Sequence, residues 1–196
     1  MRGWRHFRRA QNGIAAVEFA LLLPVMITMF FGVVELSLAL VCRADVSIMT
    51  SSAADLIAQA SSTQTSDISN VYSAAGSILY PYYSSSMPIA QAPTIRITSI
   101  VYNSSTGSTT SGTIAWTCTQ SGSGSLNPVS RSVGSTVTLP QPIMPANGSI
   151  IMAEVGYNYV SPTTKVITGP INMTYVWYTK PRQVAQIPAP TGGCPA

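Results

Sequence analysis

Residues 13–41 read GIAAVEFALLLPVMITMFFGVVELSLALV, an apolar run whose only charged residues are Glu18 and Glu35. As a helix this run would measure about 43 Å, against roughly 30 Å of bilayer hydrocarbon. A removable signal peptide has an apolar stretch of only about 7–15 residues. The run therefore predicts a permanent transmembrane helix over residues 14–41.

A basic leader, residues 1–13, precedes this helix and contains Arg2, Arg5, Arg8 and Arg9. Arginines in front of an apolar run are the usual cytoplasmic retention signal. We therefore expect a single-pass inner-membrane protein with a cytoplasmic N-terminus and an exported remainder. The four arginines alone account for the net charge of +4, so no basic nucleic-acid-binding surface is predicted for the rest of the chain.

The composition agrees with a membrane segment joined to one modest exported domain. Only 8% of the 196 residues are charged, whereas 46% are hydrophobic. Soluble domains are nearer one quarter charged, and the ample apolar content argues against disorder.

The exported part begins with a helical region, residues 42–93. Apolar residues continue at helical spacing to about residue 60, and they are Met49, Ala53, Leu56, Ile57 and Ala60. A second helix is expected after Ser66 or Asp67, either of which can cap it, and should end at Pro81.

Beyond Pro93 the apolar period changes to two, which indicates strands. The expected strands lie around residues 95–101 and 114–118, and over 150–160 and 171–179. Residues 104–112 and 121–128 are polar and are expected to be turns or mobile loops. The predicted fold is α+β: a long N-terminal helix, a second helix, a small antiparallel sheet in a head of residues 94–182, and an irregular tail of residues 183–196.

The start of the apolar helix carries the most informative motif. Basic residues lead to Gly13, the helix begins with Ile14, and a carboxylate, Glu18, follows five residues after the glycine beside Phe19. This pattern resembles the class III signal of type IV pilins and pseudopilins. With Pro24, Gly32 and Glu35 included, it is similar to the TadE-like minor pseudopilins of tight-adherence pilus systems.

The resemblance implies cleavage by a prepilin peptidase between Gly13 and Ile14. It also implies assembly with other pilin and pseudopilin subunits on an inner-membrane platform. An ionised carboxylate in hydrocarbon is costly and should find a partner or become protonated. The resemblance implies that Glu18 pairs with the free α-amine of another subunit, although a glutamate near a helix end can also extend to water.

Glu35 and Pro24 are two further features of the apolar run. Glu35 lies near the expected outer boundary, where it can reach interfacial water or act as a docking contact. Pro24 lacks an amide hydrogen and is expected to bend the helix locally. Either residue, like Phe19, could contribute to helix docking.

The three cysteines fit the proposed orientation. Cys118 and Cys194 both fall in the exported part and could form a disulfide in an oxidising compartment. Cys42, at the membrane exit, is expected to be a small apolar residue.

The sequence predicts neither an enzyme nor a metal or cofactor site. His6 is the only histidine, and no familiar catalytic or phosphate-binding motif occurs. Asp45, Asp55, Asp67 and Glu154 are the carboxylates outside the apolar run, and we expect them to be solvated. Two alternatives to the TadE-like assignment stay open: an unprocessed single-pass protein that displays a binding domain, and a minor pseudopilin of a type II secretion system.

Overall fold

The computed structural model describes residues 12–84, 86–88, 91–104, 107–128 and 130–195. The arginines of the leader and His6 lie outside the described residues. The chain forms two compact units. The first contains the described residues up to Leu40 together with residues 160–169, and the second contains residues 41–159 and 170–196.

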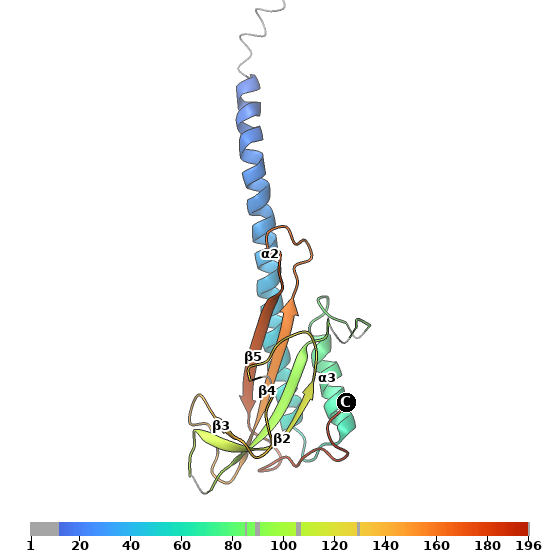
Figure 1. The fold of residues 1–196 in the computed structure, drawn as a ribbon, viewed down its shortest axis with the longest axis vertical. Helices are drawn as coiled ribbons and strands as arrows, with labels where there is room; N and C mark the ends of the chain where they lie inside the picture. Colours follow the sequence, from blue (N-terminus) through green and yellow to red (C-terminus); the bar gives the residue numbers. More distant parts are fainter. Residues whose placement is uncertain (1–11, 85, 89–90, 105–106, 129, 196) are drawn as a thin grey trace, which may run out of the picture. The chain divides into compact units, whose positions relative to one another are not determined.

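The helix α2, Asn12–Ala58, begins two residues before the predicted start and ends two residues before the predicted end (Figure 1). Within the second unit, its residues Met49, Ala53 and Ile57 are buried, as the helical spacing indicated. Leu56 is exposed instead. Ala54 and Ala58 are buried as well, so the buried stripe is shifted around the helix, away from Leu56, relative to the predicted face.

The second helix, α3, covers Thr65–Ser77 and buries residues of the predicted face such as Ile68, Val71 and Tyr72. It begins earlier than predicted, with Gln64 as its N-cap. Asp67 still contributes, because its Oδ2 accepts the backbone N–H of Gln64 at 2.9 Å. The carboxylate therefore acts from the third helical position, where acidic side chains complete a capping box.

Five antiparallel strands form one sheet in the order β3-β2-β1-β4-β5. The strands are β1 Thr94–Tyr102, β2 Ser111–Gln120, β3 Thr136–Thr138, β4 Ser149–Tyr159 and β5 Ile171–Thr179. The α+β architecture is confirmed, and four of the strands lie where alternation predicted them. The three-residue β3 was not predicted.

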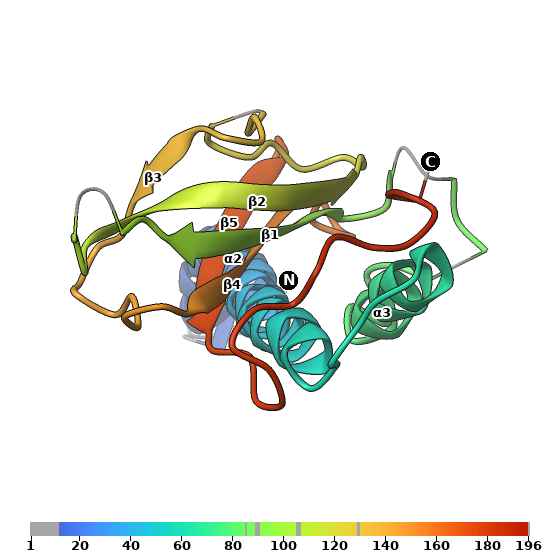
Figure 2. The same cartoon turned by 90° about the horizontal axis from the view of Figure 1, so that it is seen from below.

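Within the second unit, α3 and residues 41–58 of α2 lie on the same side of the sheet (Figure 2). The Nε of Arg43 donates to the hydroxyl of Tyr175 on β5 at 3.1 Å. Near the other end of β5, Thr179 donates its hydroxyl to Asp55 at 3.4 Å. These contacts fix the register of α2 against the edge strand β5.

A second apolar cluster covers the other face of the sheet. Ile100 of β1 and Met152 of β4 pack with Val137 of β3 and with Leu139 and Met144, which lie between β3 and β4. The sheet is therefore covered on both sides, which explains why β1 and β4 are buried along almost their whole length.

The segment 121–128, predicted to be a turn or a mobile loop, packs closely against β4. A Cβ atom added to Gly124 would collide with the backbone of Gly156 on β4. Asn158 also donates its side-chain amide to the carbonyl of Ser123, and Leu126 is buried. The glycines here permit a close approach of two backbones.

Candidate functional site

Residues 13–30, the first part of α2, are exposed on every side. Leu21, Leu22 and Leu23 follow one another around the helix, and their side chains are 74%, 54% and 38% exposed. Because successive helical residues point about 100° apart, this run leaves no protected side. By its length and composition, α2 is able to cross a membrane.

The residues of the predicted cleavage motif lie on the first turns of α2. Gly13 and Ile14 are exposed, and a side chain at position 13 would have open space around it. Gly13, Ile14, Val17, Glu18 and Leu21 line one side of the helix. Glu18 is exposed and makes no hydrogen bond or ion pair to any residue that the structure describes.

The helix continues through Pro24. The hydroxyl of Thr28 donates to the carbonyl of Pro24 at 2.8 Å, which is a local bond within the helix. Phe19 is exposed. The roles of Pro24 and Phe19 in docking stay predictions.

Glu35 has a different environment from Glu18, although both lie on the apolar helix. Its side chain is completely buried. The carboxylate accepts backbone N–H groups from Lys165 at 2.7 Å, Val166 at 3.1 Å and Ile167 at 2.5 Å, and the hydroxyl of Thr163 also donates to it. All four donors belong to the connection between β4 and β5, which is in the same compact unit.

This carboxylate site corrects the expectation that Glu35 reaches interfacial water. Its partners come from its own chain, 128 to 132 residues later. The sequence signalled only that a carboxylate in an apolar helix needs donors. It did not identify them, because backbone N–H groups are available from any non-proline residue.

Cys118 and Cys194 form a disulfide, with their Cα atoms 5.2 Å apart. It attaches the C-terminal tail to β2. The Nε1 of Trp116, two residues before Cys118, donates to the carbonyl of Ile187 at 2.9 Å. Cys42 is a free, buried cysteine.

Glu154 is not the solvated carboxylate that we expected. It lies on β4, is buried, and accepts Arg96 Nε at 2.7 Å and Arg131 Nη2 at 2.7 Å. Burial alone would raise the pKa of Glu154, but the hydrogen bonds from Arg131 and Arg96 outweigh it and the pKa is lowered. Both oxygens are bound by arginines, so the geometry gives Glu154 a structural role.

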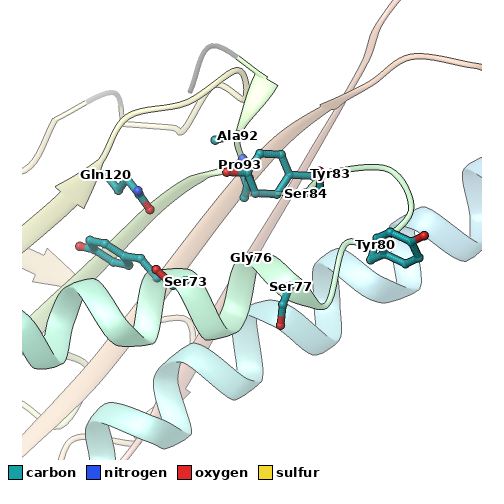
Figure 3. Close-up of a pocket in the computed structure, with 10 residues that line it drawn as sticks. Ser73, Gly76, Ser77, Tyr80, Tyr83, Ser84, Ala92, Pro93 and Gln120 are labelled. Carbon is teal, nitrogen blue, oxygen red and sulfur yellow. The ribbon is translucent and has the colours of Figure 1, made fainter. Parts of the chain in front are cut away.

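A pocket of about 450 Å³ lies in the second unit, where α3 and the residues after it approach β2 (Figure 3). Tyr80, Tyr83 and Gln120 are among the lining residues. The ring of Tyr83 rests against Gly76, where a Cβ atom would lie 3.4 Å from it. The described lining residues include no Asp, Glu, Lys, Arg or His. Within the described residues, no group of three or more potential metal ligands occurs.

Residues 13–55 match the family model of TadE-like proteins. The match covers the exposed apolar helix, the Gly13–Glu18 motif and Glu35. No curated protein and no solved structure matches the chain.

Proposed function

We propose that this chain is a TadE-like minor pseudopilin that takes part in the assembly or priming of a tight-adherence pilus. In this proposal a prepilin peptidase cleaves between Gly13 and Ile14 on the cytoplasmic side. The new N-terminal helix then docks among the helices of other subunits. The head is exported and contacts other subunits or surfaces.

The observation that carries the proposal is the exposed Glu18 on a helix that is apolar all around. A carboxylate in such surroundings must find a partner or become protonated, and the described part of the chain offers it no partner. Cleavage at Gly13 would create an α-amine at Ile14, four residues before Glu18. The same amine on a neighbouring subunit would have the charge and position to pair with Glu18.

The match of residues 13–55 to TadE-like proteins supports the same proposal. Tight-adherence pili are the setting that this family suggests. We also propose a structural rather than catalytic role for the head, where arginines bind both carboxylate oxygens of Glu154.

The mature N-terminus tests the proposal. Mass spectrometry of the protein from cells with an active prepilin peptidase should find a chain that starts at Ile14. The Gly13→Ala variant should start before residue 14. Gly169→Ala is the matched control, because position 169 also has open space for a Cβ atom. Chains that retain the leader in the wild type would contradict processing.

The second candidate is an unprocessed single-pass protein that displays a binding domain. The pocket beside α3 is the observation that favours it. This alternative predicts that the wild type and Gly13→Ala have the same N-terminus and that the substitution causes no loss of function in cells.

A further inference from the structure

We propose that the tip of the β4–β5 connection, residues 163–167, lies in the outer interfacial layer of the bilayer that α2 crosses. Val166 contacts the acyl-chain boundary, and Lys165 faces the phosphates of anionic phospholipids. The proposal rests on the membrane-spanning part of the proposed function. It assigns a lipid-binding surface to a loop that begins 128 residues after Glu35.

Helix length sets the depth of this loop. Glu35 follows Gly13 by 22 residues, which corresponds to a rise of about 33 Å. The hydrocarbon core is roughly 30 Å thick. With Gly13 at the cytoplasmic boundary, Glu35 therefore lies at the outer boundary. Because Lys165, Val166 and Ile167 donate directly to Glu35, the loop tip is held at the same depth.

Glu35 also removes the main obstacle to placing a loop there. Irregular backbone is excluded from lipid where its N–H groups have no acceptor. The carboxylate accepts three consecutive backbone N–H groups, from Lys165 to Ile167, together with the hydroxyl of Thr163. The buried charge of the helix and the polar backbone of the loop thus satisfy each other.

The side chains of the loop tip suit an interface between lipid and water. Val166 is 46% exposed. Its Cγ2 lies 4.0 Å from the position that a Cβ atom would occupy on Gly32. Gly32 precedes Glu35 by about one turn, so Val166 extends the apolar surface of the helix toward the membrane. Lys165 is exposed, and a lysine at this depth can reach the headgroup phosphates.

A depth measurement on the full chain tests the proposal. The protein is reconstituted in nanodiscs of phosphatidylethanolamine and phosphatidylglycerol at a ratio of three to one. Val166→Cys is labelled with an environment-sensitive NBD fluorophore, and nitroxide-labelled acyl chains are used as the quencher. The substitution retains the backbone N–H that binds Glu35. The buried Cys42 should react slowly in the folded protein.

Met29→Cys is the membrane reference, and Val133→Cys in the head is the water reference, since both positions are well exposed. We expect the Val166 label to be blue-shifted and quenched at least half as strongly as the Met29 label. If the Val166 label is as weakly quenched as the Val133 label while the Met29 label is quenched, the loop proposal is wrong and the membrane span stands. If the Met29 label is also unquenched, the membrane span itself is wrong.

Lys165→Glu tests the headgroup contact in the same assay. We expect it to reduce quenching of the Val166 label about twofold in the anionic nanodiscs and to have little effect in nanodiscs of phosphatidylcholine. Thr168→Glu, at another exposed loop position, is the control. Equal effects of the two substitutions would contradict a specific role for Lys165.

Discussion

Glu18 and Glu35 lie on one apolar helix, and their surroundings are opposite. Glu18 is exposed, whereas Glu35 is completely buried against backbone donors of residues 165–167. A buried carboxylate is tolerated when hydrogen bonds replace its lost hydration. In our interpretation Glu35 organises its own subunit, and Glu18 is left for another one.

Replacing Glu35 by Gln should release the loop tip. The amide retains one acceptor oxygen, but its NH₂ group would face backbone donors. Hydrogen bonds to charged groups contribute about 1.5–3 kcal/mol each, so amide exchange at residues 165–167 should accelerate about 10- to 100-fold. Hydrogen–deuterium exchange by mass spectrometry measures this. Glu18→Gln should leave the exchange of these amides unchanged. Equal exchange rates in Glu35→Gln and Glu18→Gln would contradict the role of Glu35 as the acceptor of these amides.

Glu154 should make the stability of the head depend on pH. Its pKa is lowered in the folded state. Its contribution is therefore fully present above the usual pKa of about 4.3 and is lost as the pH falls through the lower folded-state value. Glu154→Gln leaves Arg96 and Arg131 without their carboxylate and should cost about 3–5 kcal/mol at pH 7.

Thermal unfolding between pH 7 and pH 3 measures this effect. The difference in Tm between the wild type and Glu154→Gln should narrow below pH 4. Asp55→Asn is the control, because the pair between Asp55 and Arg182 is largely exposed and should contribute at most about 1 kcal/mol. If the difference in Tm between the wild type and Glu154→Gln stays constant from pH 7 to pH 3, the pKa of Glu154 is not lowered in the folded state.

At the scale of elements, the contact between segment 121–128 and β4 depends on glycine. Gly124→Ala would place a Cβ atom against the backbone of Gly156, which cannot move without disturbing the sheet. We expect a loss of about 1–3 kcal/mol in the free energy of unfolding, typical of overpacking. Chemical denaturation provides the measurement. Gly169→Ala, where nothing lies within 4 Å, should be close to neutral, and similar midpoints for the two variants would contradict the close contact.

The disulfide between Cys118 and Cys194 closes a loop with a sequence separation of 76. Cys194→Ser should lower the free energy of unfolding by about 2–4 kcal/mol, in the range for native disulfides. Reductant should lower the Tm of the wild type to that of the variant. Reductant should leave the Tm of Cys194→Ser unchanged. If reductant lowers the Tm of this variant, the effect on the wild type does not come from the disulfide.

Some elements could be predicted from sequence because their signal is local. The alternation over β4 and β5 placed both strands within one residue of their observed ends. The three residues of β3 are too few for a period to be seen. The partners of Glu35 could not be predicted, because they are main-chain groups far along the chain. Glu154 was misread because its two arginines lie 58 and 23 residues before it.

At the scale of the whole molecule, the chain combines two kinds of surface. The head buries apolar residues on both faces of its sheet, whereas the first part of α2 exposes them on all sides. Exposed apolar surface of this extent indicates a lipid or protein partner. The chain therefore contains one part suited to water and one that needs another environment.

Charges placed in the apolar helix should weaken membrane retention without unfolding the head. Leu22→Arg combined with Ile27→Arg should add about 5–7 kcal/mol to the cost of insertion. Alkaline extraction of membranes should release more of this variant than of the wild type. Val133→Arg combined with Val176→Arg, at exposed head positions, should stay membrane-bound. Equal release of both variants would argue against a membrane span.

The separation along the chain between Glu35 and its donors also means that the ribosome makes the two parts of this site at different times. Thr163 is made 128 residues after Glu35, which corresponds to about 6–25 s at common rates of bacterial and eukaryotic synthesis. During this interval the nascent helix already contains the carboxylate, but the loop that binds it has not yet been translated. A helix that enters a membrane during synthesis would therefore carry an unpaired Glu35, and the site is completed only when residues 163–167 have emerged from the ribosome.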